Sequence, residues 1–433
     1  MQLSRNPILS PWLALLLLSV LVRIAYGKFL LLDHWPGDAT WYMEAAKALV
    51  EKGWADPYWP PGLPHLLAGG LVLGIAPHWL GMVISLGMWV LFFYVLRTVV
   101  FSRGNSRRGW WLKAIFLLFP AFIHQSIVPL TYLPVAILML MAWQWMAGSW
   151  GGNPWKEGTG LGIVLGLMVL FRAASMVMLP VILLGFAWNR GQWKSAILPG
   201  LIAVSMIGLW ESRVYQQEER WVMVNTANSY NFYLGNNDWT PDYKTWLLGS
   251  EDFHHHPDYT AFYQEIDSVR QLSPRDQEQA FRNLAWDHIE AHPVEFLIRV
   301  GSRLATLLSF DTLAGATMYT QSAGWGIFLL IMDAFCYLAL LLMAWYGWAG
   351  NKWRSREKIL WLALLTAYSL PYLMAFAHPT YHLPLLGLFA WAAFRGNTFS
   401  WAAIRSRSLW SWLTLTVLMG FQILWLVTML REL

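Results

Sequence analysis

The sequence contains little charge and almost no cysteine. Asp, Glu, Lys and Arg make up 13% of its 433 residues, whereas hydrophobic residues make up 57%. The one cysteine, Cys336, lies in a hydrophobic run, so no disulfide can form within the chain and cysteine usage does not indicate a redox compartment. The net charge of +5 does not indicate nucleic-acid binding, because the basic residues lie in short segments between hydrophobic runs.

Hydrophobic runs recur along the whole chain, and each is long enough to cross a hydrocarbon core of ~30 Å as a helix. Backbone polar groups in lipid must pair within their own segment, so the pattern predicts an α-helical polytopic membrane protein. The first run is too long for a signal-peptide core and is expected to be a retained span. We predict about eleven spans, near residues 11–32, 79–100, 112–128, 131–149, 159–172, 174–189, 195–213, 325–348, 359–377, 381–395 and 409–429.

Charge separates the segments between these spans into two kinds. Basic segments such as "SRGNSRRGWWLK" and "GNKWRSREK" fall on one side, which the excess of Lys and Arg marks as cytoplasmic. Of the 25 acidic residues, five lie in 33–60 and sixteen in 211–311. We therefore predict an N-terminal transmembrane module (1–213) with a first outer loop (33–78), an outer insertion (214–324) and a C-terminal transmembrane module (325–433).

The outer insertion is predicted to be α/β or mostly helical. Its beginning, 220–237, is rich in Val, Tyr and Phe and suggests strands. Ser273 followed by Pro274 is typical of a helix start. The segment 292–310 is amphipathic, and a central Arg in a span costs ~2.5–3.5 kcal/mol. We expect it to lie at the membrane interface, with its arginines facing lipid headgroups.

Aromatic and acidic residues stand together in "HWPGDATWYMEAAKALVEKGWADPYWPPGLPHLL", after the first predicted span. Asp38 stands where a helix should begin, and Gly53 where it should end. One interpretation of Asp38 is an N-cap that accepts backbone N–H bonds. A carboxylate bonded in this way stays ionised, and an ionised carboxylate at the membrane surface is also suited to act as a general base.

This stretch resembles the first outer loop of GT-C glycosyltransferases, in the branch of dolichyl-phosphate-mannose protein mannosyltransferases and bacterial aminoarabinose transferases. Asp38-Ala-Thr-Trp-Tyr42 is similar to the family's D-x-x-x-Y signature, and "YWPP" to its aromatic Pro-Pro element. "NFYLGNN", "AFRNLAWDHIEAHPVEFLIR" and "HPTYHLPLLGLFAWAA" resemble later family segments in the same order. The resemblance implies a GT-C-like fold, with Asp38 as the catalytic base, in a bacterial inner (cytoplasmic) membrane with the site facing the periplasm or exterior.

The resemblance also implies partners: a polyprenyl-phosphate-linked sugar donor, a glycan, lipid or protein acceptor, and membrane lipids. Arg172 is the leading candidate for the donor phosphate, because its planar fork donates two parallel hydrogen bonds. The alternative is a snorkelling Arg at the end of a span. Arg303 and His382 are further phosphate candidates, and the candidates for sugar or acceptor contacts are Tyr42, Trp59, Tyr381 and Asn236.

The sequence departs from the family at two positions. Tyr132 stands where relatives often carry an acid, and Thr380 where an Arg commonly precedes the tyrosine. No cofactor is predicted with certainty, and a divalent metal is left open because oxygen ligands such as Asp252 or Asp258 suit hard cations. The run His254-His255-His256 is interpreted as a solvated loop, since three consecutive side chains cannot all face one site.

We therefore predict an inverting glycosyltransferase that moves a sugar from a polyprenyl-phosphate carrier to an acceptor hydroxyl. The alternative is a transporter or flippase of a lipid-linked glycan. That class usually carries ionisable residues near the bilayer midplane, and here Asp333 is the main one. A non-catalytic subunit of an envelope-assembly complex is the third hypothesis.

Overall fold

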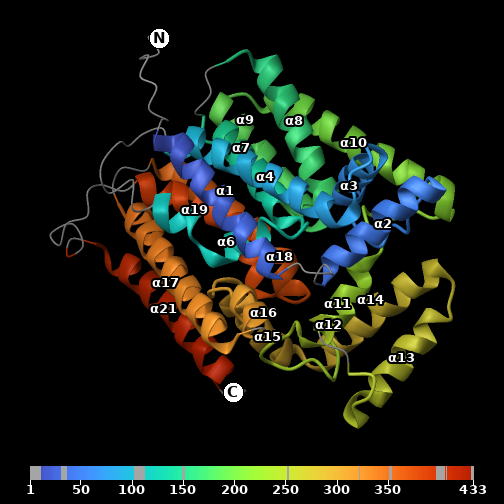
Figure 1. The fold of residues 1–433 in the computed structure, drawn as a ribbon. Helices are drawn as coiled ribbons and strands as arrows, with labels where there is room; N and C mark the ends of the chain where they lie inside the picture. The colour runs from blue at the N-terminus through green and yellow to red at the C-terminus, as the bar shows by residue number, and fades with distance from the viewer. Residues whose placement is uncertain are drawn as a thin grey trace.

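The chain is helical throughout the part that the structure covers. The computed structural model describes residues 11–30, 37–101, 113–148, 152–250, 253–320, 322–350, 354–395, 405 and 407–430. In these ranges every regular element is a helix and there is no strand (Figure 1). The helical fold class predicted from the hydrophobic runs is confirmed.

Helix α7 forms the centre of the N-terminal half. Nearly all its side chains are buried, and it packs against α4, α8, α9 and α19. The helices of this half are α1 (Pro11–Leu30), α2 (Asp38–Lys52), α3 (Gly62–Val72), α4 (Pro77–Val99), α6 (Pro120–Gln125), α7 (Tyr132–Met146), α8 (Pro154–Phe171), η2 (Ala173–Val177), α9 (Met178–Arg190), η3 (Trp193–Ala196) and α10 (Ile197–Glu218).

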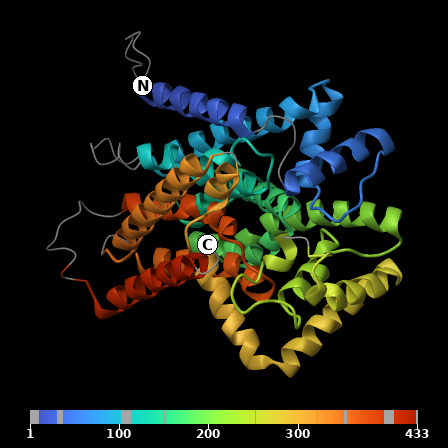
Figure 2. The same cartoon turned by 60° about the horizontal axis from the view of Figure 1, so that its bottom comes forward.

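The second half supplies the outer insertion and the last apolar helices. Figures 1 and 2 place α2, α11, α13 and α14 together at one end of the molecule, away from the N-terminal end of α1. The helices are α11 (Ala227–Gly235), α12 (Leu247–Ser250), η4 (Pro257–Tyr259), α13 (Thr260–Arg270), α14 (Pro274–Ala291), α15 (Pro293–Leu307), α16 (Leu313–Tyr319), α17 (Ala323–Trp348), α18 (Ser355–Met374), η5 (Pro379–His382), α19 (Leu383–Arg395) and α21 (Leu409–Leu430).

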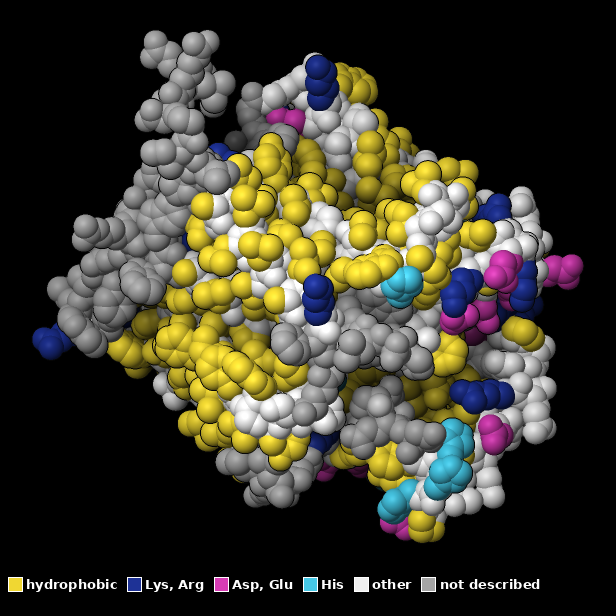
Figure 3. All heavy atoms as spheres, in the orientation of Figure 1, with side chains coloured by type: hydrophobic (Ala, Val, Ile, Leu, Met, Phe, Trp, Pro, Cys, Tyr) yellow, Lys and Arg dark blue, Asp and Glu magenta, His cyan; other side chains and the backbone are white. Residues whose placement is uncertain are grey.

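The outer surface of the bundle has the apolar character of a membrane protein. Large hydrophobic side chains are exposed along α1, α4, α10, α17 and α21, and Figure 3 shows them as a broad yellow belt. Exposed apolar area on this scale indicates contact with lipid or a partner. By length and composition, five described helices can cross a membrane: Pro77–Val99, Ala173–Arg190, Trp193–Glu218, Ala323–Trp348 and Leu409–Thr428. The total of about eleven spans stays a prediction.

The predicted span near 112–128 is not one continuous helix. Residues 113–117 are helical, the backbone then breaks, and α6 begins at Pro120. The N–H of Ala121, in the first turn of α6, donates to Asp333 Oδ1 of α17 at 2.7 Å. A carboxylate from another helix thus pairs with one of the N–H groups that a helix start leaves without a partner.

The strand predicted at the start of the insertion is wrong. Within 220–237 the chain forms α11, in which Tyr230 and Tyr233, three residues apart, lie on one face. The Tyr230 and Tyr233 rings lie 5.2 and 5.4 Å from that of Phe281, and Tyr233 also stacks on Phe262. Packing against α13 and α14 therefore outweighs the β-propensity of the local sequence, which is a weak and context-dependent preference.

The prediction that the arginines of α15 face lipid headgroups is also wrong. Arg299 and Arg303 are 2% and 0% exposed. The Arg299 guanidinium donates to the carbonyl oxygens of Asn237, at 3.1 Å, and of Thr240. The polar side of α15 thus faces the protein, where backbone carbonyls take the place of water.

Small residues bring α8 and α10 into close contact. Gly158, Gly162 and Gly166 recur every fourth residue of α8, so they lie on one face. A Cβ on Gly162 would lie 2.9 Å from the Pro199 carbonyl oxygen, and one on Gly166 would lie 2.7 Å from Met206 Sδ. Such a stripe lets two helix backbones approach closely in a membrane protein.

A glycine also fixes the first outer loop against α8. A Cβ on Gly62, at the start of α3, would lie 2.9 Å from the Leu170 carbonyl oxygen and 2.9 Å from Phe171 Cγ. A change of side-chain rotamer cannot move the backbone oxygen. Helix α3 therefore lies close to the C-terminal end of α8, beside the residue that follows it, Arg172.

Gly62→Ala should push α3 away from α8 and lower the melting temperature, because overpacking costs ~1–3 kcal/mol. The control is Gly69→Ala in the same helix, where a Cβ meets nothing within 4 Å. Alanine is preferred over glycine in helices by ~0.5–1 kcal/mol, so this control should not melt earlier than wild type. Scanning fluorimetry of the purified protein measures both, and equal melting temperatures for the two variants would contradict the close approach.

Candidate active site

Asp38 is the first residue of α2. Its neighbour Gly37 occupies the N-cap position with φ +54°, a conformation that favours glycine. The prediction that Asp38 is the N-cap is therefore wrong by one residue, and its side chain accepts no hydrogen bond from the described residues. The carboxylate still lies in the first turn, where the helix dipole favours negative charge. Gly53 ends the helix at φ +70°, as predicted.

Arg172 lies at the break between α8 and η2. The backbone is extended at this residue, which turns its side chain out of the helical path. Nε donates to the Tyr372 hydroxyl at 2.5 Å, and Nη1 donates to Thr131 Oγ1 at 3.2 Å. Nη2 makes no hydrogen bond to the described residues, and the residue is half-buried. One edge of the guanidinium is thus fixed while the other can still donate.

Three tyrosine rings surround this guanidinium. The ring centroids of Tyr132, Tyr372 and Tyr381 lie 4.7, 5.3 and 4.9 Å from Arg172 Cζ. They come from α7, α18 and η5, so three distant segments meet at one cation. Cation–π contacts of this kind hold a guanidinium in place without neutralising its charge.

Aromatic residues of the first outer loop line the Asp38 side of the site. Tyr42 lies one turn after Asp38 on α2, and its ring centroid is 4.9 Å from that of Trp59. The Trp59 ring in turn contacts that of Tyr58 at 5.0 Å. Asp38, Tyr42 and Trp59 therefore form a continuous group that faces the Arg172 cluster.

Opposite charges meet at this centre without a direct ion pair. Burial raises the pKa of the Asp38 carboxyl, and the Arg172 guanidinium acts in the opposite direction and lowers it. Solvent still reaches Asp38, although protein atoms surround it on most sides. Burial, with the charge of Asp38, also raises the pKa of the Tyr42 hydroxyl. Among the described residues no ion pair joins Asp38 to Arg172, so both charges are available to a ligand.

Several members of this centre were not singled out from the sequence as site residues. Thr131 and Tyr372 bind Arg172 directly, and Tyr132 lies over the guanidinium. The Tyr368 hydroxyl donates to the Tyr381 carbonyl at 2.6 Å. Tyr368 and Tyr372 are four residues apart on α18 and so share a face. That spacing was the available signal, but it looks like ordinary core packing.

The structure places Arg303 and Asn236 away from this centre. Arg303 Nη1 donates to the carbonyl oxygens of Leu373 and Met374 at 2.9 and 3.2 Å, and Nη2 donates to that of Gly235 and to Asn236 Oδ1. Helix ends leave carbonyls without partners, and a cation there is favourable. In place of the predicted phosphate and sugar contacts, the two side chains join the ends of α11 and α18.

His382 also lies outside the centre. Its side chain is fully buried, and its ring packs 4.6 Å from that of Tyr337 on α17. The neighbouring Tyr381 side chain is the one that reaches Arg172. His382 therefore packs in the interior of this structure, and its phosphate contact stays a prediction.

The segment for which a metal was left open forms no cluster of metal ligands among its described residues. His254, His255 and His256 are exposed, as expected of a solvated loop, and so is Asp258, while Asp252 lies outside the described residues. One other group, Asp238 with His288 and His292, brings its ligand atoms within 4.8 Å of one another. His288 Nδ1 already pairs with Asp238 at 2.8 Å and its Nε2 with the Arg299 guanidinium at 2.9 Å. A cation so close opposes metal binding, and we assign no metal to this group.

No protein-family model, no curated protein and no solved structure matches this chain.

Replacing Arg172 with leucine removes the positive charge that lowers the pKa of Asp38, whereas burial, which raises it, persists. We expect the pKa of Asp38 to rise, so that the carboxyl stays protonated to higher pH. Infrared difference spectroscopy of the carboxyl C=O band during a pH titration measures this shift, with Asp38→Asn identifying the band. Arg213→Leu serves as a control for loss of a cation elsewhere on the same side. An unchanged pKa in Arg172→Leu would contradict the electrostatic link.

Proposed function

We propose that the chain is an inverting glycosyltransferase that transfers a sugar from a polyprenyl-phosphate carrier to an acceptor hydroxyl on the outer side of a bacterial cytoplasmic membrane. The observation that supports this proposal is the centre formed by Asp38 and Arg172. The Asp38 carboxylate accepts no hydrogen bond from the described residues, and Arg172 Nη2 donates none to them. The two charges are close enough for Arg172 to lower the pKa of Asp38. Together they supply a proton acceptor and an anion ligand.

In the proposed reaction Arg172 binds the donor phosphate. Tyr372 and Thr131 occupy Nε and Nη1, which leaves Nη2 to donate to a phosphate oxygen. Negative charge grows on that phosphate as the bond between the anomeric carbon and the phosphate oxygen breaks. A cation already fixed by tyrosine rings stabilises this charge without having to reorient during the reaction.

Asp38 accepts the proton of the attacking hydroxyl. The acceptor oxygen forms a bond to the anomeric carbon, the electron pair of the breaking bond goes to the phosphate, and the proton goes to Asp38. A single displacement inverts the anomeric configuration. Burial raises the pKa of Asp38, which makes its ionised form a stronger base.

Tyr42, Trp59 and Tyr381 lie in positions suited to sugar contacts. Tyr42 and Trp59 contact each other on the Asp38 side, and Tyr381 lies against the guanidinium. A sugar bound between Asp38 and Arg172 would meet aromatic faces from both directions. Nucleotide sugars stay in the cytoplasm, so a site on the outer side requires a donor carried across by a lipid. The exposed apolar helices provide a surface for such a lipid tail.

Two buried acids favour the alternative of a transporter or flippase, because intramembrane carboxylates commonly mark transport pathways. Asp333 and Asp311 are each 1% exposed. Both have structural partners, however. Asp333 accepts the N–H of Ala121 at the start of α6, and Asp311 accepts that of Leu313 at 2.9 Å, at the start of α16. We therefore rank transport second.

Asp38→Asn should abolish transfer, because an amide cannot take the acceptor proton, and general-base catalysis contributes roughly a factor of 10²–10⁴. Purified protein would be incubated with a panel of polyprenyl-phosphate sugars and extracted membrane glycoconjugates, and the products identified by mass spectrometry. Glu44→Gln removes an exposed carboxylate from the same helix and should retain activity. Full transfer by Asp38→Asn would refute the assigned base.

Arg172→Lys keeps the positive charge but loses the fork that binds Tyr372, Thr131 and a phosphate together. We expect KM for the lipid-linked donor to rise about tenfold or more, the loss that a charge-assisted hydrogen bond of ~1.5–3 kcal/mol implies. Steady-state kinetics in nanodiscs with varied donor measure this change. Arg213→Lys is the matched control. A donor KM equal to wild type in Arg172→Lys would mean that the phosphate binds elsewhere.

A further inference from the structure

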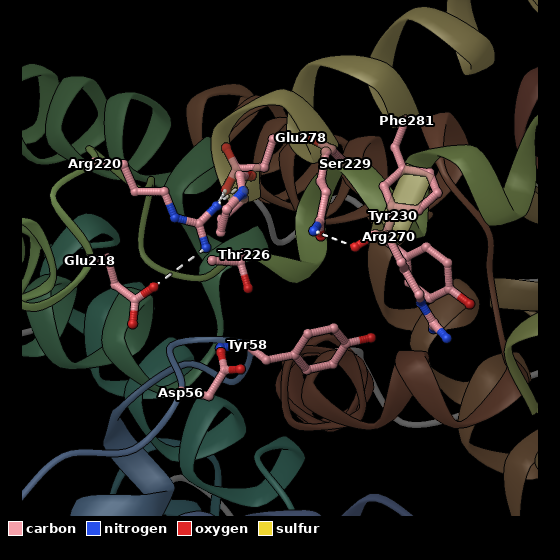
Figure 4. Close-up of a pocket in the computed structure, with 12 residues that line it drawn as sticks. Asp56, Tyr58, Glu218, Arg220, Thr226, Ser229, Tyr230, Arg270, Glu278 and Phe281 are labelled. Carbon is pink, nitrogen blue, oxygen red and sulfur yellow. Dashed lines mark hydrogen bonds and ion pairs between the residues drawn. The ribbon is translucent and has the colours of Figure 1, made fainter. Parts of the chain in front are cut away.

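A recess lies between the first outer loop and the insertion. It has a volume of about 360 Å³ and is lined from five segments: the loop after α2, the end of α10, α11, and the facing ends of α13 and α14. Figure 4 shows Tyr58 across one side of this pocket, with Arg220 at one end and Arg270 beside Tyr230 at the other. The volume is within the range of ligand sites, at roughly the size of one or two sugar rings.

Hydrogen bonds to the insertion hold the wall formed by the first outer loop. Asn225 Nδ2 donates to the Tyr58 carbonyl at 3.0 Å, and the N–H of Thr226 donates to the Pro57 carbonyl at 3.0 Å. The Tyr58 N–H in turn donates to Asp56 Oδ1 at 2.9 Å. The backbone of the first outer loop is therefore fixed against the insertion on this side of the pocket.

The charges of the pocket divide into a paired set and an unpaired set. Arg220 lies 3.1 Å from Glu278 and 3.7 Å from Glu218, which neutralises it. Arg270, by contrast, makes no ion pair with the described residues, and its guanidinium lies beside Tyr230, with its Cζ 5.8 Å from the ring centroid and a hydrogen bond to the Tyr230 side chain. Asp56 is likewise exposed and without a cationic partner there. The Arg270 guanidinium thus keeps hydrogen-bond donors for a ligand, and the Asp56 carboxylate keeps an acceptor oxygen.

Aromatic faces alternate with these polar groups. Tyr58, Tyr230 and Phe281 all line the pocket, and the rings of Tyr230 and Phe281 meet at 5.2 Å. A sugar ring presents apolar C–H faces and a rim of hydroxyls. Aromatic walls with a few oriented polar groups suit both surfaces, since carboxylates and guanidiniums each span adjacent hydroxyls.

The charge balance narrows the ligand class. The lining contains three acidic and two basic side chains, so it disfavours a strongly anionic ligand. The described part of the insertion offers no strand edge on which an extended peptide could add. A lipid tail would need a long apolar groove, whereas this pocket is short and polar at both ends. A neutral glycan fits these constraints best.

The pocket is electrostatically connected to Asp38. Burial raises the pKa of the Tyr58 hydroxyl, and Tyr230 and Asp38 add to this effect, so the phenol lies within reach of both. Tyr58 also contacts Trp59, which contacts Tyr42 one turn after Asp38. Tyr58 thus connects the pocket to the group that contains the proposed base.

We propose that this pocket binds the terminal sugars of a neutral glycan, which is the acceptor of the transfer. The inference rests on the proposed function for the role of the glycan as the acceptor. The binding of the glycan can be tested without catalysis. The sequence left a glycan, a lipid or a protein open as the acceptor. According to this proposal, the pocket recognises glycan and does not recognise protein or lipid.

The test uses the full-length Asp38→Asn protein in nanodiscs, which binds without turnover. It is applied to a glycan array of neutral, amino and acidic oligosaccharides and to an array of unstructured peptides. We expect binding to neutral glycans, and about tenfold weaker binding when Arg270→Ala or Tyr230→Ala is added, the loss expected from ~1.4 kcal/mol. Arg275→Ala and Tyr243→Ala remove the same side-chain types at exposed positions outside the pocket and should change nothing. Scanning fluorimetry confirms that each variant is folded.

Three results of the binding experiment would overturn the inference: no glycan bound, binding to peptides only, or glycan binding undiminished in both pocket variants. Glycan binding that depends on the pocket, in a wild-type protein that transfers no sugar, would overturn the transferase proposal and leave the pocket standing. If wild type transfers sugar and the Arg270→Ala and Tyr230→Ala variants transfer it equally well, the pocket inference alone would be overturned. The two proposals can therefore fail separately.

Discussion

The Arg172 guanidinium is the constraint on which the arrangement of the candidate site depends. A cation inside a helical bundle must be hydrogen-bonded, because an unpaired charge is costly to remove from water. Thr131, Tyr372 and the surrounding rings meet this need, and they come from α7, α18 and η5. Satisfying one side chain therefore fixes three segments relative to the end of α8. Asp38 then meets a cation whose position is already determined.

The outer insertion is held to this frame by a second set of polar contacts. Arg303 binds the C-terminal carbonyls of both α11 and α18, so this side chain connects the insertion to the C-terminal helices. Asn225 and Thr226 tie the first outer loop to the insertion from the other side. The pocket lies at the second of these attachments, since Tyr58 and Thr226 both line it. Its shape is consequently set by the same contacts that connect the domains.

The sequence predicted the parts that local patterns determine. Hydrophobic runs marked the helices, Gly53 and Ser273 marked a helix end and a helix start, and the first outer loop yielded Asp38, Tyr42 and Trp59 as neighbours. It could not predict what depends on distant partners. Arg303 on an amphipathic helix resembles a headgroup contact, because the carbonyls that bind it come from segments about 70 residues away. The contacts of His382 and Asn236 were missed for the same reason, since nothing in their local sequence reveals what packs against them.

The glycine stripe on α8 has a consequence for how the molecule can change. At Gly162 a Cβ would meet the Pro199 backbone, so at this point α8 and α10 lie as close as their backbones allow, while Gly158 and Gly166 leave room for side chains of α10. Helix α8 leads into Arg172, and α10 leads into the insertion, so this close contact also limits the distance between the proposed donor end and the outer cap. Descendants of this sequence that handle bulkier substrates would have to acquire their extra room in the cap helices, where side chains still determine the distances.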